Sequence, residues 1–347
     1  MKIAIATDAW SPQVNGVVTT LNQTRQELTR MGHEVKMITP EGRRTFPLPT
    51  YPEIRLALFQ KRAIARELDD FEPDCVHIAT EGTIGLAVRR YCIRRNIPFT
   101  TAYHTQFPEY VRKRVPIPIG WTAAMLRWFH RPAVRTMVPT RGMRETLLER
   151  GFKDVVIWSR GVQTDIFTPD DPYDYDLPGP VWIFVGRVAI EKNIESFLDL
   201  PLPGSKVIIG DGPDRQRLTG QYPDCHFLGY QFGRDLARRI AGADVFVFPS
   251  LTDTFGIVML EAMACGVPVA AFPVTGPIDV VSPGLSGCLD DDLIAACSRA
   301  LDLNSHDCRH YAETRTWRRA TRQFVSNLAP RCTKYEQPLA SPSAYLQ

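Results

Sequence analysis

Two acidic residues near the start of an apolar helix are the first candidates for chemistry in this sequence. Asp253 and Glu261 are separated by seven residues in TDTFGIVMLEAMACGVPVAAFP, which begins at Thr252. Glu261 stands in a helix apolar enough for the core, where a carboxylate needs strong hydrogen-bond donors. The vicinal hydroxyls of a ribose would supply two such donors. Asp253, just before the helix, would then lie near a sugar and a diphosphate.

Both acidic residues also have ordinary structural explanations. Asp253 could cap the helix N-terminus, and Glu261 could pair with an internal arginine. Two cations add to the chemical interpretation, because Arg187 and Lys192 stand five residues apart directly after the apolar run VWIFV. Two cations this close in sequence can stabilise negative charge on a ligand. Two solvated surface cations remain an alternative.

These side chains need a framework, and the pattern of apolar runs predicts one. Both halves of the chain alternate short β-rich runs with helical periodicity, which predicts parallel, doubly wound α/β sheets. In the first half we expect strands at 2–10, 35–39, 75–79 and 97–104, and helices at 17–33, 61–71 and 85–96. In the second half we expect strands at 181–188, 206–213, 226–230, 244–250 and 267–273, with the most apolar helix at 257–265.

The length of 347 residues fits two domains with a cleft between them. A proline- and aspartate-rich stretch without apolar periodicity marks the linker. The expected division is a first domain at 1–167, a linker at 168–180, a second domain at 181–310, a C-terminal helix at 311–329 and a disordered tail at 330–347.

Composition excludes several classes of function. The net charge of +3 does not favour nucleic acid as a partner, and the eight cysteines form no CxxC pair and no zinc-type Cys/His cluster. The first apolar run stops at Thr7-Asp8, so we expect no signal peptide, and no stretch approaches the ~20 apolar residues of a membrane span. Asp174-Tyr175-Asp176 has the DxD form of a metal motif but lies in the linker, so we expect no metal. The sequence therefore predicts a cytoplasmic enzyme, dissolved or peripheral on the inner face of the cell membrane.

The stretch TDTFGIVMLEAMACGVPV resembles the E-x7-E signature of retaining GT-B glycosyltransferases, especially glycosyltransferase family 4. The resemblance implies the GT-B fold, with two Rossmann-like domains, an acceptor in the first and a nucleotide sugar in the second. It implies that Glu261 holds the nucleotide ribose and that Asp253 contacts the donor hexose, with Phe255, Gly256 and Ile257 also at the donor. Asp253 stands where the family has glutamate, which shortens the side chain by one methylene.

Two further matches lie in the first domain. Asn15 and Gly16, in NGV, resemble the family's glycine loop, whose backbone approaches the donor diphosphate at a helix N-terminus. His104, in TTAYHTQFPEY, ends a strand and matches a family histidine that lies beside the donor sugar and stabilises an oxocarbenium-like transition state. A turn glycine and a structural histidine are the alternatives. Arg160, in RGV, replaces the asparagine of a family NGV element, and we expect a hinge or phosphate-adjacent role for it.

Two matches lie in the second domain. GRVAIEKNIE resembles the family's G-R-x4-K element, which implies that Arg187 and Lys192 hold the leaving diphosphate. KVIIGDGP resembles the strand and turn near the nucleotide base, where Gly210 and Gly212 would let the backbone pass the ring. A simple β-turn explains GDGP equally well.

An acceptor surface is expected between Glu109 and Glu145, where the chain has no acidic residue and accumulates arginines. Trp121, Met125, Trp128 and Phe129 recur every three to four residues among these cations, as in an interfacial helix. Core tryptophans beside a solvated arginine face, or a nucleic-acid patch, are the alternatives. The expected acceptor or membrane contacts are Tyr110, Arg112, Lys113, Arg114, Trp121, Arg127, Trp128 and Arg131.

The resemblance is strongest to bacterial transferases that glycosylate diacylglycerol or related lipids, through NGVVTTL, YHTQFPEY, LRWFHRPAVRT and the acidic signature. It implies a retaining transfer of hexose from a UDP-sugar, or second from GDP-mannose, to a lipid such as diacylglycerol or to a glycan, without a cofactor. A GT-B nucleotide-sugar epimerase or hydrolase, and a catalytically silent membrane-binding protein, are the alternatives. The sequence leads to no prediction of oligomeric state.

Overall fold

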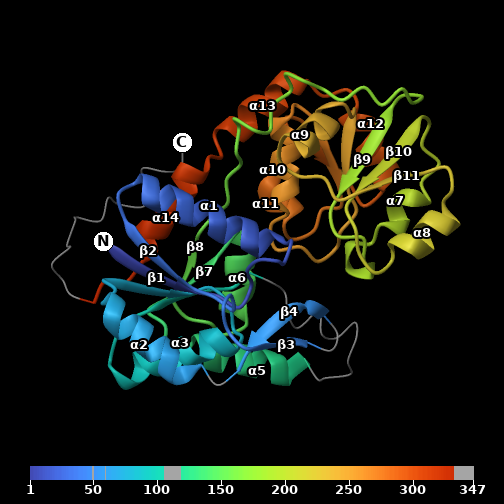
Figure 1. Cartoon of the computed structure of the whole chain (residues 1–347). Helices are drawn as coiled ribbons and strands as arrows, with labels where there is room; N and C mark the ends of the chain where they lie inside the picture. The colour runs from blue at the N-terminus through green and yellow to red at the C-terminus, as the bar shows by residue number, and fades with distance from the viewer. Residues whose placement is uncertain (49–50, 59, 105–118, 332–347) are drawn as a thin grey trace.

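The computed structural model describes residues 1–48, 51–58, 60–104 and 119–331. Within these ranges the chain forms two α/β domains, each built around one six-stranded sheet (Figure 1). All strand pairs of the two sheets are parallel, so the expected fold class is confirmed.

The first sheet has the order β2-β1-β5-β6-β7-β8. Its strands are β1 (Lys2–Ala6), β2 (Glu34–Ile38), β5 (Cys75–Ile78), β6 (Thr100–Ala102), β7 (Arg135–Val138) and β8 (Val155–Ile157). In β1, Ile3 and Ile5 pack into one core while Ala4 and Ala6 pack into another. Because both faces of the sheet are covered, the strand is a continuous apolar run rather than an alternating one.

The helices of the first domain cover both faces of this sheet. They are α1 (Gly16–Arg30), α2 (Lys61–Phe71), α3 (Thr83–Arg94), α5 (Ile119–His130) and α6 (Arg141–Glu149). An antiparallel hairpin of β3 (Thr45–Leu48) and β4 (Tyr51–Ala57) was not expected from the sequence. Each of its strands contains a proline, which argues against strand structure except at sheet edges.

The second sheet has the order β11-β10-β9-β12-β13-β14. Its strands are β9 (Val181–Val185), β10 (Ser205–Ile209), β11 (His226–Gly229), β12 (Val245–Phe248), β13 (Val269–Ala271) and β14 (Gly287–Leu289). The helices around it are η1 (Ile190–Lys192), α7 (Glu195–Leu198), α8 (Arg215–Gln221), α9 (Gly233–Ala241), α10 (Ile257–Ala264), α11 (Pro277–Val280) and α12 (Leu293–Ala300).

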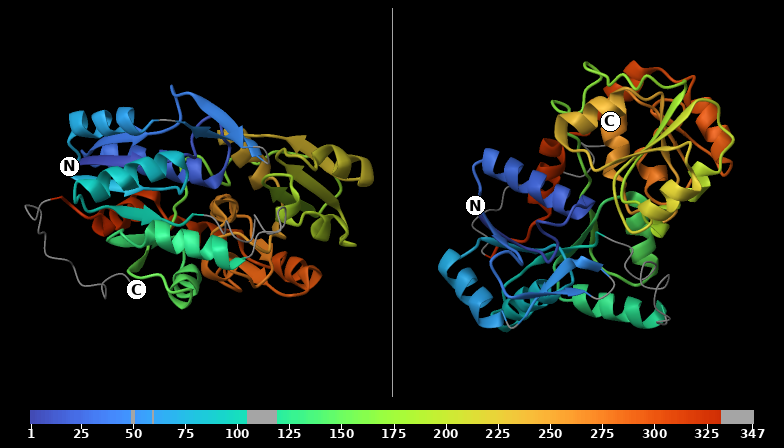
Figure 2. Two further views of the ribbon diagram at one scale, coloured as in Figure 1. Left: turned by 90° about the horizontal axis from the view of Figure 1, so that it is seen from below. Right: turned by 45° about the vertical axis from the view of Figure 1, so that its right-hand side comes forward.

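The chain returns from the second domain to the first through two helices rather than one. α13 (Ser305–Glu313) packs on α10, whereas α14 (Trp317–Asn327) packs on α1, as Figure 1 and the right view of Figure 2 show. The expected single helix at 311–329 is therefore divided. Thr316 begins the second helix, because its Oγ1 accepts a hydrogen bond of 3.2 Å from the backbone N–H of Arg319. Of the expected tail, residues 332–347 lie outside the described part of the chain.

Two stretches of chain link the domains, and they contact each other where residues 161–162 cross residues 315–317. The N–H of Val162 donates to the carbonyl of Arg315 at 2.9 Å. A Cβ on Gly161 would lie 2.2 Å from the backbone nitrogen of Trp317, so only glycine allows this approach. Arg309 of α13 joins the first of these stretches to the second domain. It donates hydrogen bonds to the carbonyls of Thr164 and Phe167 in that stretch and of Ala264 in α10.

Candidate active site

The order of the strands places a crevice at the carboxyl ends of each sheet. In the second sheet the chain runs from β9 to β10 on one side and returns to β12 on the other side. Ligands bind at such switch points in open α/β sheets. The loop after β9 carries Arg187, and the loop after β12 carries Asp253. The first sheet has its switch point between β1 and β5.

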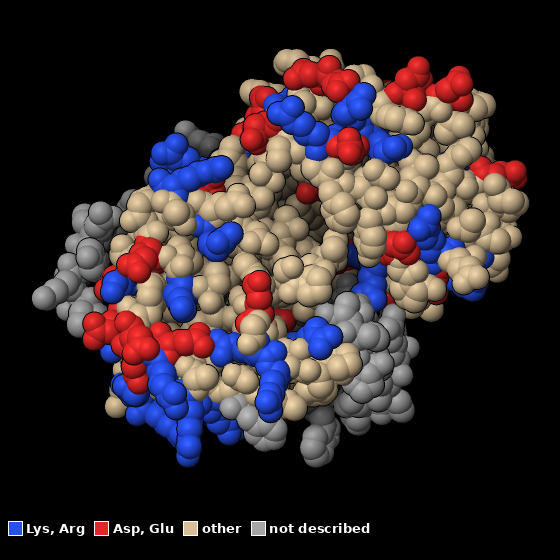
Figure 3. All heavy atoms as spheres, viewed as in Figure 1, with Lys and Arg blue, Asp and Glu red and all other residues tan. Residues whose placement is uncertain are grey.

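These two edges meet between the domains, where the surface is hollowed (Figure 3). Thr254 of the second domain donates from Oγ1 to the main-chain carbonyl of His104 at 2.8 Å. A Cβ on Gly16, at the start of α1, would lie 3.9 Å from Cδ1 of Ile257, at the start of α10. The N-termini of two helices from different domains therefore face the same cleft, where each favours an anion.

The structure brings Lys192 and Asp253 together as an ion pair. The Nζ of Lys192 lies 2.7 Å from Oδ1 and 2.8 Å from Oδ2 of Asp253, and both side chains are largely buried. Arg187 precedes Lys192 on the same loop, with its Nε 4.0 Å from Oε1 of the buried Glu191. The expected acid for the donor hexose and the expected cation for its diphosphate thus neutralise each other.

Glycines on the neighbouring loop explain how Arg187 is held. A Cβ on Gly210 would lie 1.9 Å from the carbonyl oxygen of Gly186, and one on Gly212 would lie 2.3 Å from that of Val188. The N–H of Gly186 also donates to the carbonyl of Ile209 at 2.9 Å. In this structure the two glycines admit the backbone of the Arg187 loop, whereas we had expected them to admit a nucleotide ring.

Glu261 lies in α10 with apolar surroundings. Burial raises the pKa of its carboxyl group to about 7, and no hydrogen bond from its side chain to another described residue is found. The alternative in which it pairs with an internal arginine is thus not what the described residues show. A carboxylate without an internal partner, next to a cleft, is suited to accept hydrogen bonds from a ligand.

The loop before α10 differs in part from the expected donor contacts. Gly256 is the N-cap residue and adopts φ of 77°, so the alternative in which Asp253 caps this helix is wrong. A Cβ on Gly256 would lie 2.9 Å from Cζ of Phe248, which leaves no room for a side chain. Phe255 packs into the core of the second domain with 6% of its surface exposed, so its side chain supports the loop. Ile257 is half-buried and faces Gly16.

Asn15 has a structural task in addition to its expected place near the diphosphate. Its Oδ1 accepts hydrogen bonds of 3.0 Å from the N–H groups of Val17 and Val18, so it caps α1. Its side-chain amide donates to Gln13 at 3.2 Å. The backbone N–H of Gly16, at the first position of the helix, remains as the group that a phosphate could approach.

His104 follows β6 and is held on three sides. Its Nδ1 lies 3.0 Å from Nη2 of Arg160, its ring packs edge-on against Trp158 at 5.5 Å between centroids, and its carbonyl accepts from Thr254. Burial, and then the positive charge of Arg160, hold the pKa of His104 well below its usual range. Sequence reasoning missed this contact, because nothing in the spacing of the two residues indicates it.

A second contact between the domains was also not predicted from the sequence. Asp279 of α11 accepts a hydrogen bond of 3.1 Å from the N–H of Gly142 in the first turn of α6. A carboxylate of one domain thereby caps a helix of the other domain. No signal in the sequence relates these two residues, since the pairing exists only once both domains are folded.

The expected membrane contacts divide into three groups. Tyr110, Arg112, Lys113 and Arg114 lie outside the described residues, and Trp121 is described only as part of α5. Arg127 and Trp128 are exposed near the end of α5, and Arg131 is exposed directly after it. Met125 and Trp128 are each 50% exposed. Phe129, expected in the same apolar stripe, is instead buried against the first sheet.

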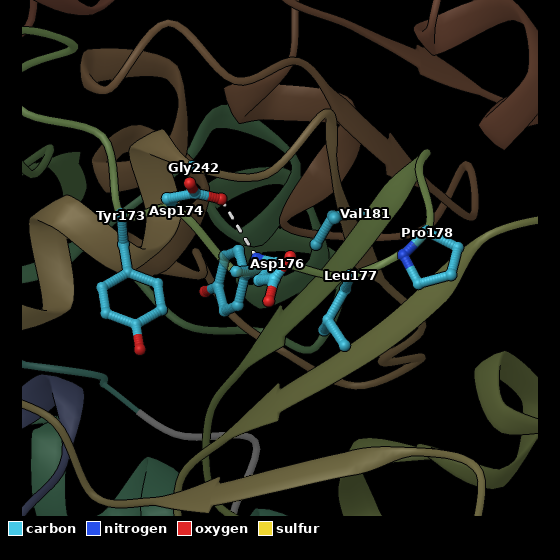
Figure 4. Close-up of a pocket in the computed structure, with 8 residues that line it drawn as sticks. Tyr173, Asp174, Asp176, Leu177, Pro178, Val181 and Gly242 are labelled. Carbon is cyan, nitrogen blue, oxygen red and sulfur yellow. Dashed lines mark hydrogen bonds between the residues drawn. The ribbon is translucent and has the colours of Figure 1, made fainter.

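The linker aspartates line a different pocket, shown in Figure 4. The N–H of Asp176 donates to Oδ1 of Asp174 at 3.0 Å, which forms a local turn. The pocket lies by Val181, the first residue of β9, and so at the opposite end of that strand from Arg187. In the part of the chain that the structure describes, no group of three or more His, Cys, Asp or Glu side chains is arranged to hold a metal.

Comparison with known proteins gives matches in both domains. The model of Glycosyltransferase Family 4 matches residues 14–166, and that of Glycosyl transferases group 1 matches residues 179–303. A GDP-mannose-dependent alpha-mannosyltransferase of Mycobacterium tuberculosis is 32% identical over 318 residues, which cover 83% of each chain. An alpha-monoglucosyldiacylglycerol synthase of Streptococcus pneumoniae is 25% identical, covering 88% of this chain and 80% of its own. Sucrose-phosphate synthase from Thermosynechococcus elongatus shares the fold, with a TM-score of 0.72, 20% identity, and coverage of 93% of this chain and 97% of its own.

Removing either partner of the Lys192–Asp253 pair should change phosphate binding in opposite directions. Asp253→Ala removes the carboxylate that competes with a phosphate for the ammonium group, so we expect UDP and GDP to bind about threefold to tenfold more tightly, whereas Lys192→Ala should weaken both nucleotides by about tenfold or more. Calorimetric titration of both variants with each nucleotide measures these changes. Arg217→Ala is the control, because it removes an arginine paired with Glu195 at 2.7 Å on the outside of the same domain. Parallel weakening in both variants would contradict competition between Asp253 and the phosphate.

The raised pKa of Glu261 predicts that ligand binding depends on pH. Below about pH 7 the carboxyl group is mostly protonated and accepts poorly from ribose hydroxyls, so affinity should rise roughly tenfold between pH 6 and pH 8. A nucleotide sugar is the right titrant, since its diphosphate carries an ester at each end and does not titrate in this range. Glu261→Gln should bind weakly and equally at both pH values.

The same shift has a separate consequence for stability, which needs no ligand. A carboxyl group with a pKa raised from 4.5 stabilises the fold below pH 4.5 and loses that contribution as the pH rises through about 7. Glu261→Gln, which resembles the protonated form, should therefore melt at a higher temperature than the wild type at pH 8 and at a similar temperature at pH 5. An equal difference at both pH values would show that the carboxyl group does not titrate there.

Proposed function

Because the chain belongs to glycosyltransferase family 4 and has the GT-B fold, we propose that it transfers mannose from GDP-mannose to a lipid acceptor at a membrane surface. It is a hexosyltransferase of this family. The observation that supports the donor is the 32% identity, over both domains, to a relative named as a GDP-mannose-dependent alpha-mannosyltransferase. This relative favours the second of the two donors expected from the sequence over UDP-sugars.

In the proposed reaction the donor lies along the edge of the second sheet. The ribose hydroxyls donate to Glu261, and the diphosphate lies toward the Arg187 loop and Lys192. Because the phosphate replaces Asp253 as the partner of Lys192, the carboxylate of Asp253 becomes free to accept hydrogen bonds from the hexose. The donor itself thus changes the ion pair that is present in the free protein.

The chemical step is the departure of the diphosphate from the anomeric carbon. Arg187 and Lys192 stabilise the charge that develops on the leaving oxygens, which lowers the barrier only if they interact more strongly with the transition state than with the bound donor. We propose that the acceptor hydroxyl attacks from the same face, with its proton passing to the leaving phosphate. The α configuration of GDP-mannose is then retained, in keeping with the name of the mannosyltransferase relative.

We assign the acceptor side of the reaction to the surface formed by α5 and α3. Met125 and Trp128 are exposed on α5 beside the exposed Arg127 and Arg131. Arg89 of α3 lies with its Cζ 4.0 Å from the ring centre of Trp128, and the exposed Arg90 and Arg94 follow on the same helix. Basic side chains gather on this lower face of the first domain in Figure 3. Aromatic and cationic groups together are typical of a surface that contacts anionic lipid headgroups.

A lipid acceptor also agrees with the second relative, whose name describes the synthesis of a glucosyl-diacylglycerol. None of the helices in the described ranges has both the length and the apolar character required to cross a bilayer. We therefore propose peripheral attachment through α5, with the acceptor reaching the cleft from the membrane.

The proposed reaction predicts a mannosylated lipid. We expect purified protein with GDP-mannose and vesicles of diacylglycerol and anionic phospholipid to form an α-linked product, which mass spectrometry and proton NMR identify. Arg187→Ala and Lys192→Ala should each lower kcat by about 100- to 1000-fold, whereas Arg217→Ala should not. Formation of product from UDP-glucose but not from GDP-mannose would refute GDP-mannose as the donor. Formation of free mannose as the sole product, with or without lipid, would refute a lipid acceptor and favour a hydrolase.

Attachment through α5 predicts binding to anionic vesicles that salt reverses. Each cation near an anionic surface contributes about 1 kcal/mol, so Arg127→Ser with Arg131→Ser should weaken vesicle binding roughly tenfold to thirtyfold in a sedimentation assay. Met125→Ser should weaken it further through loss of apolar contact. The control Arg318→Ser with Arg319→Ser removes two exposed cations of α14. Equal loss in the control would show that only net charge matters, and equal binding to neutral vesicles would refute the electrostatic contact.

A further inference from the structure

Arg160 is a buried cation at the edge of the cleft. Only 5% of its surface is exposed, and no ion pair with a carboxylate is found for it among the described residues. Its Nη1 donates to the main-chain carbonyls of Trp158 and Ser159, and its Cζ lies 4.6 Å from the ring centre of Trp158. Burial lowers its pKa to about 9, which leaves the guanidinium charged at neutral pH. Burying a charged guanidinium costs desolvation free energy, and no carboxylate partner offsets that cost here, so the buried charge needs another explanation.

The remaining contact of Arg160 is with His104. Nη2 of Arg160 lies 3.0 Å from Nδ1 of His104. A guanidinium can only donate, so Nδ1 must accept, and the ring proton of the neutral imidazole must therefore sit on Nε2. The Nε2 atom is buried and has no hydrogen-bond partner among the described residues.

Two other contacts hold His104 in place. Trp158 packs edge-on against His104, and Thr254 of the second domain holds the His104 carbonyl at 2.8 Å. The charged or titratable groups that act on His104 are Arg160 and the buried His77. The ring of His77 packs edge-on against Trp158, with 5.6 Å between the ring centroids. Burial opposes a positive charge on His104 most strongly and the charge of Arg160 adds to this effect, so the ring stays neutral across the physiological range.

We propose that Arg160 is a positioning residue for His104, which it fixes as the neutral tautomer with the proton on Nε2. His104 is then a hydrogen-bond donor that neither gives up nor takes up a proton during the reaction. If the proposed function holds, on which this step rests, Nε2–H of His104 donates to an oxygen of the transferred sugar or of the acceptor. The nearby guanidinium also polarises the imidazole, which strengthens donation from Nε2.

Nitrogen NMR of protein labelled with 15N-histidine tests the tautomer without any substrate. The seven histidines give few signals, and the His104→Gln variant identifies the relevant pair. We expect wild-type His104 to show the Nε2–H form unchanged from pH 5 to pH 8. In Arg160→Met, which keeps an unbranched apolar stem but removes the charge and the donor, we expect a mixture of tautomers and a His104 pKa that moves up toward the usual range of histidine.

Kinetics then link the tautomer to turnover. In Arg160→Met we expect kcat to fall about tenfold to a hundredfold, with the dissociation constant of GDP within threefold of wild type and with a new loss of activity toward acidic pH. Arg160→Lys, which keeps a charged donor, should recover part of the rate and of the tautomer preference. Arg135→Met is the matched control, because Arg135 also donates to main-chain carbonyls, those of Asn327 and Leu328, but contacts no histidine.

Two results would overturn the proposal. One is an unchanged Nε2–H tautomer in Arg160→Met, which would mean that the surrounding protein sets it. The other is a loss of GDP affinity parallel to the loss of kcat, which would make Arg160 a direct ligand of the diphosphate. If no donor supports glycosyl transfer, the NMR result still decides the tautomer, so failure of the proposed function and failure of this inference are distinguishable.

Discussion

The crossing of the two interdomain connections at Gly161 is the constraint on which the rest of the molecule depends. There the backbone of residues 161–162 lies against that of residues 315–317, too close for any side chain on Gly161. Trp158 and Arg160 precede this crossing and α14 follows it, so the same few residues set both the domain orientation and the environment of His104. A small displacement at the crossing would move the carboxyl ends of one sheet relative to those of the other. The Thr254–His104 and Asp279–Gly142 hydrogen bonds also join the two domains and oppose such a displacement.

Within the cleft, charges are distributed so that a nucleotide sugar complements them. The second domain offers a partly protonated Glu261 and a Lys192 whose charge Asp253 balances. The first domain offers the N–H of Gly16 at the start of α1, which Asn15 does not cap, and the charge of Arg160 behind His104. Ribose hydroxyls, a diphosphate and a hexose are the groups that would satisfy these in order along the cleft. The proposed transfer therefore requires that the donor displace Asp253 from Lys192.

Much of the site could be predicted from the sequence because its signals are local. The strand before Arg187, the strand before Asp253 and the apolar helix around Glu261 are each visible as short runs, and the carboxyl ends of neighbouring parallel strands must converge. The tasks of individual residues depend on contacts from elsewhere in the chain. Gly210 and Gly212 make room for the Arg187 loop, Phe255 packs in the core, and Asn15 caps a helix. In each case the residue type suits two tasks, and the contact that decides between them comes from a segment elsewhere in the chain.

The sequence by itself determined the fold class, the family and the positions of the two acids and two cations, because periodicity and spacing survive without knowledge of the partners. Only the tertiary structure decided that Lys192 pairs with Asp253 across 61 residues and that Arg160 reaches His104 across 56. It also divided the C-terminal stretch into α13 and α14 at the crossing, and buried Phe129 while leaving Trp128 exposed. Protonation states and tautomers belong to this second group. They depend on burial and on charges a few ångströms away, which no residue carries in its own sequence neighbourhood.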